Sequence, residues 1–251
     1  MTKSDRHGTG LERVQRIGSY VLDLVFPPRC VSCLRYGQWF CDSCAQRPLP
    51  APRRQVCRYC GQWLPVDAAG LGSPCPGCGD ALGWVGIAAL HEGPLRQAIH
   101  ALKYEDRAQL GSNLGRYLRA LTFVGPWPAI VERVDGIVPV PLHRDRLKER
   151  GYNQSNLLAA PLSAKSEKPV LDRAVERFKA TDTQVGLSPS ERAENVKGKF
   201  RANSGLVAGK ALLLVDDVYT TGATMRECAS VLRDAGAAAI YGIALATPAT
   251  R

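Results

Sequence analysis

The sequence lacks three kinds of segment that would each point to a particular class of protein. No apolar run is long enough to span a bilayer, and the most apolar N-terminal stretch, IGSYVLDLVF, is interrupted by Asp23. That stretch has no small-residue cleavage site, so it does not resemble an export signal. The Gly-Lys-Thr signature of a nucleotide-triphosphate P-loop is also missing. We therefore expect a cytoplasmic protein with no transmembrane segment.

Positive charge is in excess over negative charge. The 251 residues include 33 Lys and Arg against 23 Asp and Glu, for a formal net charge of +10. The excess is concentrated in residues 1–60 and 141–201. Such a balance predicts an anionic partner, which would be a phosphorylated small molecule, a nucleic acid or an acidic membrane surface. A solvated basic face is the alternative interpretation.

The chain divides into three parts by composition. Leu11, Val14, Ile17 and Val21 recur at helical spacing, which predicts an amphipathic helix within residues 1–28. Its expected role is packing against the main domain, with peripheral membrane contact as the alternative. A cysteine-rich module is predicted over residues 29–82, and a larger domain over residues 83–251.

Eight of the nine cysteines form four C-x-x-C pairs. The two-residue spacing lets both thiolates of a pair bind one ion, and two pairs complete a tetrahedral four-sulfur site. We therefore predict two structural zinc sites, whose ligands are Cys30, Cys33, Cys41, Cys44, Cys57, Cys60, Cys75 and Cys78. Sequential pairing, first with second and third with fourth, is the simplest arrangement, and crossed pairing is stereochemically open. Disulfides, redox motifs and an iron–sulfur cluster are the weaker alternatives.

The ninth cysteine, Cys228, has a plainer interpretation. The run GATMRECASVLRDAGA places Met225, Cys228 and Leu232 on one face of a helix that ends at Gly236. We therefore expect Cys228 to be a small buried hydrophobic residue and not a catalytic one.

Apolar strands alternate with helices after the cysteine-rich module. Strands are predicted near residues 84–90, at 134–140, at 212–217 and at 239–248, and helices at 93–104, 109–121, 153–163 and 223–235. The charged segment RDRLKERGYNQ is expected to be a loop. Continuous hydrophobic strands that alternate with helices predict a mostly parallel, doubly wound α/β sheet. Ligands of such sheets bind at the carboxyl ends of the strands.

The segment LLLVDDVYTTGATM combines a buried strand, two carboxylates and a small-residue loop that opens a helix. Backbone N–H groups of Thr220 to Thr224 can converge on a phosphate at the helix N-terminus. Asp216 and Asp217 would repel that phosphate, but they can accept hydrogen bonds from vicinal hydroxyls. A ribose 5-phosphate satisfies both halves of the segment. A simple helix cap would explain only one threonine and one aspartate.

LLLVDDVYTTGAT closely resembles the phosphoribosyl pyrophosphate motif of type I phosphoribosyltransferases. LVFPP before CVSC, then LKY, VPVPLHRDRLKERGYNQ and TDTQVGLSPSERAENVKGKF occur in the order that is seen in the ComF family. The resemblance covers nearly all the chain after about the first ten residues. It implies a type I phosphoribosyltransferase-like fold, with the cysteines as an N-terminal zinc module and a link to DNA uptake in natural competence.

The resemblance also implies roles for individual residues. Asp216 and Asp217 would hold the ribose hydroxyls, and Thr220, Thr221, Gly222, Ala223 and Thr224 the 5′-phosphate. The cations that would approach the pyrophosphate are Arg144, Arg146, Lys148 and Arg150, and Arg150 with the two aspartates would be catalytic. Thr181 to Asn195 resembles a loop that closes over the site, with ligand-binding candidates Gln184, Arg192 and Asn195. Lys103 belongs to the family's LKY motif and is a further ligand-binding candidate.

The implied activity is transfer of a phosphoribosyl group, with magnesium bound to the diphosphate. Some purine phosphoribosyltransferases have a catalytic aspartate where this chain has Thr220, so the resemblance identifies no acceptor. The alternative function is a non-catalytic sensor of a phosphoribosyl ligand, or an adaptor that binds single-stranded DNA. A third interpretation is a purely structural partner of the uptake motor, which makes a DNA-uptake ATPase a candidate partner.

Overall fold

The computed structural model describes residues 27–48, 50, 54–56, 63–65, 82, 85–179 and 195–249. The strands are β1 (Arg54–Val56), β2 (Trp63–Pro65), β3 (Val85–Leu90), β4 (Gly136–Pro139), β5 (Val175–Arg177), β6 (Phe200–Ala202), β7 (Ala211–Val218) and β8 (Ala239–Thr247). The helices are α2 (Asp42–Ala45), α3 (Gly93–Tyr104), α4 (Leu110–Leu121), α5 (Trp127–Arg133), α6 (Arg144–Arg150), α7 (Gln154–Ser166), α9 (Ser204–Val207) and α10 (Ala223–Asp234).

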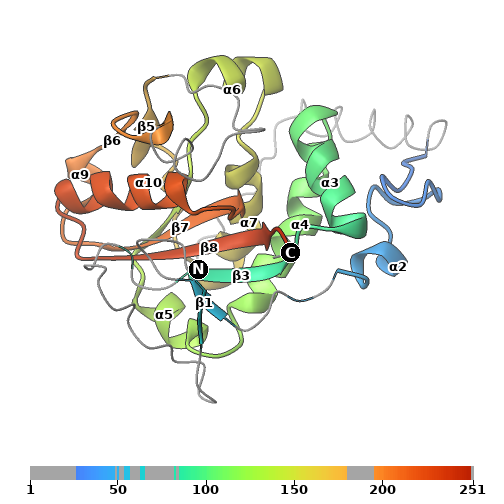
Figure 1. Cartoon of the computed structure of the whole chain (residues 1–251), viewed down its shortest axis with the longest axis horizontal. Coiled ribbons are helices and arrows are strands. Elements are labelled where there is room, and N and C mark those ends of the chain that lie inside the picture. The colour runs from blue at the N-terminus through green and yellow to red at the C-terminus, as the bar shows by residue number, and fades with distance from the viewer. Residues whose placement is uncertain are drawn as a thin grey trace, which may run out of the picture.

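The central sheet has four parallel strands in the order β3-β8-β7-β4 (Figure 1). β7 pairs with β4 on one side and with β8 on the other, and all four strands end at the same edge. The predicted parallel α/β fold is therefore confirmed. Two short antiparallel pairs, β1 with β2 and β5 with β6, lie outside this sheet.

Side chains of β7 alternate between two hydrophobic layers. Leu213 and Val215 pack in a cluster with α3, α4 and α7, whereas Leu212 and Leu214 pack in a second cluster with α10. This alternation follows from the two-residue period of a strand. Helices therefore cover both faces of the sheet, which explains why its strands have near-continuous hydrophobic sequences.

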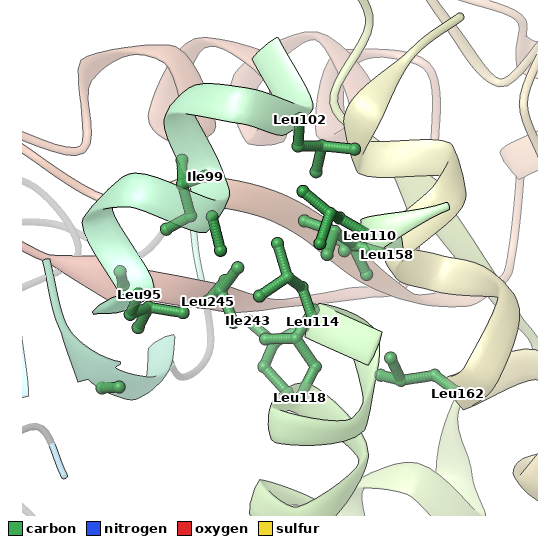
Figure 2. Packing of buried hydrophobic residues seen from close by; sticks show 14 of the residues in the cluster. Leu95, Ile99, Leu102, Leu110, Leu114, Leu118, Leu158, Leu162, Ile243 and Leu245 are labelled. Atoms are coloured by element: carbon green, nitrogen blue, oxygen red, sulfur yellow. The ribbon is translucent and has the colours of Figure 1, made fainter. Parts of the chain in front are cut away.

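Leucines dominate the layer that holds α3 and α4 in place. Figure 2 shows them meeting between the two helices, α7 and β8, and the labelled residues are Leu95, Ile99, Leu102, Leu110, Leu114, Leu118, Leu158, Leu162, Ile243 and Leu245. Each such side chain contributes about 1.5–3 kcal/mol when it is fully buried. This packing anchors the C-terminal end of α3, which reaches the carboxyl edge of the sheet.

The segment 144–150 is a helix, so the prediction of a charged loop was wrong. The His143 side chain accepts a hydrogen bond from the Asp145 N–H at 3.3 Å, and the helix ends at Gly151, whose φ is 78°. Asp145 in the first turn and Arg150 in the last turn complement the helix dipole. α6 has no buried residue, so it lacks the apolar periodicity by which helices are predicted.

The remaining predicted elements lie close to their expected positions. The strands and helices near 84–90, 93–104, 109–121 and 223–235 differ from the observed bounds by at most one residue at either end. The helix expected in the N-terminal residues 1–28 lies outside the described residues, apart from its last two positions. Across the described part of the chain, no helix has both the length and the apolar character that a membrane span needs.

Candidate functional site

Two acidic residues mark the point where β7 reaches the carboxyl edge of the sheet. Asp216 and Asp217 are adjacent in sequence, and the Asp217 N–H donates to Asp216 Oδ1 at 2.8 Å. Asp216 Oδ1 also accepts from Ser155 Oγ at 3.4 Å, which brings the start of α7 to the site. Asp217 is only 4% exposed, and its Oδ2 receives no hydrogen bond from any described residue. The site therefore contains a buried carboxylate oxygen that lacks a hydrogen-bond donor among the described residues.

Lys103 forms an ion pair with this buried carboxylate. Its Nζ lies 2.8 Å from Asp217 Oδ1, and the two side chains are 21% and 5% exposed. Burial on its own lowers the pKa of Lys103, but the charge and hydrogen bond of Asp217 outweigh burial and raise that pKa. Lys103 is therefore a fixed cation at the site.

The electrostatic environment of Asp216 disfavours its charged form. The residue retains some exposed surface, yet protein atoms surround its carboxyl group. Burial and the negative charge of Asp217 raise the pKa of Asp216 to about 7, while Lys103 and the hydrogen bonds to Asp216 oppose this shift. Lys103 is thus in contact with Asp217, and its charge lowers the pKa of Asp216 less than burial and Asp217 raise it.

The loop from Thr220 to Thr224 joins β7 to α10. Gly222 has a φ of 73°, and a Cβ atom at this position would lie 2.1 Å from the Tyr219 hydroxyl oxygen. Only glycine fits such a position, because both the backbone conformation and the space exclude a side chain. Ala223 and Thr224 then open the 12-residue helix α10, whose first N–H groups lack helical acceptors. The Ala223 N–H donates to Thr221 Oγ1 at 3.4 Å, and the other N–H groups of this first turn lie where helix N-termini bind anions.

Arg150 lies at the end of α6, beside the end of α3. Its Nη1 donates to Gln154 Oε1 at 2.5 Å, and its Cζ lies 5.6 Å from the centroid of the Tyr104 ring. The Tyr152 hydroxyl donates to the Leu102 carbonyl at 2.7 Å. These contacts join the LKY and RGYNQ segments into one unit that carries both Lys103 and Arg150.

The other cations of α6 lie elsewhere on the surface. Arg144 forms an ion pair with Glu176 of β5 at 2.7 Å, and Arg146 pairs with Glu149 within its own helix at 2.9 Å. Lys148 is exposed. The structure thus brings Arg150 next to the α3 end, whereas Arg144 is held by the β5–β6 pair.

The structure describes only one of the three ligand-binding candidates predicted in the loop that would close over the site. Gln184 and Arg192 lie outside the described residues. Asn195 is described, and its side-chain oxygen accepts from Lys199 Nζ at 3.3 Å. Their roles toward a ligand stay predictions.

Sequence reasoning did not single out Ser155, Arg177 or His91. Ser155 is fully buried and reaches Asp216 from α7. Arg177 on β5 is close enough for the charge of Asp216 to raise its pKa, although burial, the larger effect, lowers it. His91 follows β3, and burial together with Lys103 lowers its pKa. These three contacts depend on tertiary packing, and no local pattern in the sequence indicates them.

Cys30, Cys33, Cys41 and Cys44 form a candidate metal centre. Their sulfurs all lie within 4.8 Å of one another, and those of Cys33 and Cys41 are 3.5 Å apart. Four sulfurs at tetrahedral corners around zinc are about 3.8 Å apart, given a Zn–S distance near 2.3 Å. The donor set therefore fits zinc, and it joins the first C-x-x-C pair to the second. Cys57, Cys60, Cys75 and Cys78 lie outside the described residues.

The thiols of this cluster differ in acidity. Burial raises the pKa of Cys30, but hydrogen bonds from the backbone N–H groups of Cys33, Cys41 and Ser32 bring it down to about 6. Burial raises the pKa of Cys44 to about 12. A divalent cation would favour the thiolate at both positions, which is the form that binds metal.

The cysteine cluster packs directly on the main domain. Three of its cysteines belong to the same hydrophobic cluster as α3 and α4. Arg107 in the α3–α4 connection lies over the Trp39 ring at 4.6 Å, and the Tyr117 hydroxyl donates to the Ala45 carbonyl. The cysteine segment therefore contacts the main domain at Arg107 and Tyr117, which follow Lys103 in the chain. Cys228, in contrast, is completely buried in α10, as expected for a small hydrophobic residue.

Comparisons with known proteins identify the class. A family model described as phosphoribosyl transferase domain matches residues 150–251. A solved glutamine phosphoribosylpyrophosphate amidotransferase from B. subtilis is 21% identical, with a TM-score of 0.40, over 59% of this chain and 30% of that one. The matched domain, the parallel sheet and the four-cysteine cluster define a phosphoribosyltransferase-type protein with an N-terminal cysteine module.

Curated relatives then identify the family. The DNA utilization protein YhgH of Escherichia coli K12 is 35% identical over 86% of this chain and 96% of its own length. Competence protein F of Haemophilus influenzae is 31% identical over 87% of this chain and 97% of its own length. Competence protein ComFC of Bacillus subtilis matches 41% of this chain at 33% identity, over 40% of its own length. The chain belongs to the ComF family.

Proposed function

We propose that the protein binds 5-phosphoribosyl diphosphate and transfers its phosphoribosyl group to an acceptor. The observation that carries this proposal is the buried, ion-paired Asp217 beside Asp216, immediately before the Gly222 loop. One ligand with vicinal hydroxyls and a phosphate satisfies both features. The type of domain matched by residues 150–251 supports the same ligand.

Each part of the site would have one task. Asp216 and Asp217 accept hydrogen bonds from the ribose hydroxyls, and the amides of Thr221 to Thr224 bind the 5′-phosphate. Arg150 meets the diphosphate, and its guanidinium stabilises the charge of the leaving group. The acceptor attacks C1 as the bond from C1 to the diphosphate oxygen breaks, and the electron pair leaves on that oxygen. The site contributes mainly by positioning and electrostatics.

Magnesium fits the chemistry of this site, because it prefers oxygen donors and the diphosphate, the ribose and the adjacent carboxylates of Asp216 and Asp217 are all of this kind. When bound, it would neutralise the leaving diphosphate. Zinc at Cys30, Cys33, Cys41 and Cys44 is proposed as a structural ion, because four thiolates fill its coordination sphere.

Calorimetry with 5-phosphoribosyl diphosphate and magnesium tests the proposal. The wild-type protein should bind, and replacement of both aspartates by asparagine (Asp216→Asn with Asp217→Asn) should weaken binding by about a hundredfold or more, since two charged acceptors are lost. Asp172→Asn with Asp234→Asn is the matched control, because both of these aspartates are exposed and outside the site. Equal affinity of the two double variants would contradict the assignment of the carboxylates.

We propose single-stranded DNA binding as a second function, on a separate observation. Exposed aromatic rings lie beside cations near the carboxyl edge: Tyr104 is 64% exposed and lies under Arg150, and Phe178 is 39% exposed with Arg201 at 5.7 Å. Rings that stack on bases, with cations for the phosphates, are typical of single-strand sites. The names of the curated relatives, which refer to DNA utilization and competence, support this function. A DNA-uptake ATPase as partner stays a prediction.

Fluorescence anisotropy with a labelled oligonucleotide tests DNA binding. Tyr104→Ala with Phe178→Ala should weaken binding about tenfold or more, and affinity should fall steeply with salt. Phe123→Ala is the matched control, because Phe123 is also exposed and has Lys165 at 6.0 Å, but it lies at the other end of α4 from the site. If Phe123→Ala were as harmful as the double change, this surface would not be the DNA site.

A further inference from the structure

We propose that Lys103 is a positioning residue that serves as the counter-ion of the carboxylate pair Asp216 and Asp217. Its charge thereby sets how much magnesium the site needs to bind its ligand. The inference rests on the proposed function and adds the electrostatic requirement of that same site. Its starting point is the 2.8 Å contact between Lys103 Nζ and Asp217 Oδ1.

The ion pair is not explained by stability. A buried lysine and aspartate lose their hydration, and their attraction often only compensates for this loss. Well-packed apolar residues would serve a core equally well, and such residues surround Asp217 along the rest of β7. The pair lies instead at the carboxyl edge of a parallel sheet, where ligands of this fold class bind. Its placement therefore points to a role toward a ligand.

The charge of the ligand explains why a cation is needed here. Asp216 and Asp217 lie next to the loop proposed to bind a phosphate, and a phosphoribosyl diphosphate carries several negative charges. Without a compensating charge, the carboxylates would repel the ligand that their hydrogen bonds are meant to hold. Lys103 supplies one positive charge on the Asp217 side while leaving Asp217 Oδ2 without a described donor. Lys103 thus neutralises the carboxylate through one oxygen and leaves the other without a hydrogen bond, so that a small movement of the site would present it to a hydroxyl.

The backbone around Lys103 is held firmly, so its side chain stays at the carboxylates. Leu102 is fully buried in the leucine layer, and its carbonyl accepts the Tyr152 hydroxyl. On the other side, the Tyr104 ring lies beside Arg150. Alternation along β7 directs Asp217 toward the α3 layer, the same layer as Leu213 and Val215, which is why Lys103 meets Asp217 and not Asp216.

Magnesium can perform the same neutralisation from the ligand side. Free magnesium and the fixed ammonium group therefore act as partial substitutes for each other. With Lys103 present, the ligand should bind even when magnesium is scarce. Without it, binding should depend steeply on magnesium. This dependence separates a counter-ion from a residue that only supports the fold, since a packing defect would weaken binding equally at every magnesium concentration.

Calorimetry of the full zinc-loaded chain with 5-phosphoribosyl diphosphate tests the inference at low and high magnesium, about 0.1 and about 10 mM. Relative to wild type, Lys103→Met should lose on the order of 10- to 100-fold in affinity at low magnesium and less than about threefold at high magnesium. Lys103→Arg keeps the charge and should follow wild type. Lys165→Met, at the far end of α7, is the matched control and should change neither value.

Lys103→Gln provides a second test if Lys103→Met fails to fold, because its amide can still donate to Asp217 while the charge is removed. It should show the same magnesium dependence as Lys103→Met. Wild-type affinity in these variants at both magnesium levels would overturn the inference, and so would a loss that is equal at both levels. Absence of binding by the wild-type protein itself would overturn the proposed function, and this inference with it.

Discussion

Asp216 and Asp217 are neighbours in the chain but are stabilised in different ways. Asp217 is neutralised by Lys103, whereas burial and the charge of Asp217 raise the pKa of Asp216 to about 7. Near neutral pH the pair therefore carries less than two full negative charges. This lowers the repulsion that a phosphate in the adjacent Gly222 loop would meet.

Stability should depend on pH through Asp216. Its pKa is about 7 in the folded protein and near 3.8 when exposed, so the folded state binds an extra proton between these values. The free energy of unfolding should therefore fall as pH rises from about 4 to about 7, by a few kcal/mol at most. Urea denaturation across this range should show the decrease in wild type and a much flatter profile in Asp216→Asn.

Asp172→Asn is the control for this measurement, because Asp172 is exposed. Its pH profile should parallel that of wild type. A profile for Asp216→Asn with the same slope as wild type would mean that Asp216 titrates at its ordinary pKa and that its burial is less complete than the structure indicates.

At the scale of single residues, sequence patterns could identify site residues but not the residues with which they form ion pairs. LLLVDDVYTTGAT contains Asp216, Asp217 and Gly222 in one short segment, so local chemistry was enough to predict them. The Lys103–Asp217 pair joins residues that are 114 positions apart in the chain. Likewise, nothing in the segment RDRLKERG indicates that Arg144 pairs with Glu176. Such contacts depend on tertiary packing.

At the scale of elements, α4 and α7 approach each other closely at Gly115. A Cβ atom on Gly115 would lie 2.7 Å from Pro161 Cγ and 2.8 Å from the Leu158 carbonyl oxygen. Gly115→Val should therefore force the helices apart and lower the free energy of unfolding by about 2 kcal/mol, since overpacking outweighs the small gain in helix propensity. Chemical denaturation measures this change.

Ser112→Val provides a matched control on the same helix. Ser112 is exposed, so the new side chain has room and the change in stability should stay within about 0.5 kcal/mol. If the two variants were equally stable, α4 and α7 would have to be able to separate at little cost. Ser155 and Gln154 begin α7, so such freedom would also loosen the site.

Elements with an apolar face were predictable, and elements without one were not. α3, α4 and α10 show leucine or methionine at helical spacing and were expected within one residue of their bounds. α6 is stabilised by its His143 cap, its end charges and Gly151, none of which creates a hydrophobic pattern. The β5–β6 pair was missed because three-residue strands are too short to show alternation.

At the scale of the whole molecule, the four-cysteine cluster, proposed to bind zinc, connects the N-terminal segment to the main domain. Removal of zinc by a chelator should lower the melting temperature by roughly 10 °C, because the thiols lose their common ion and the packing of Trp39 and Tyr117 is weakened. Scanning calorimetry measures this shift. Cys33→Ser should melt at a similarly reduced temperature and respond less to the chelator.

Elemental analysis separates this centre from the second predicted one. Wild type should contain about two zinc ions per chain, and Cys33→Ser about one. Cys228→Ala is the control, because Cys228 is buried in α10 and far from the cluster in sequence, and it should keep both ions. A loss of both ions in Cys33→Ser would contradict independent sequential sites.

The alternation of apolar strands and helices predicted the parallel α/β architecture, but it did not predict the order of the strands. Sequence suggested a parallel sheet with its ligands at the carboxyl edge, but the order β3-β8-β7-β4 emerges only from packing. Spacing alone left sequential and crossed cysteine pairing open, and the convergence of Cys30 to Cys44 resolves this for the first two pairs. The predicted bounds 29–82 and 83–251 for the module and the main domain stay predictions.

α6 stands on the surface with none of its side chains in the core. Selection on its sequence is therefore largely uncoupled from selection on folding. A charge that has no described ion-pair partner on this helix, such as that of the exposed Lys148, can therefore be exchanged in a designed library with little effect on the packing of the core. The leucine layer beneath the sheet offers no such freedom, because its side chains are buried. For anyone seeking to retune the protein, α6 is the natural place to begin.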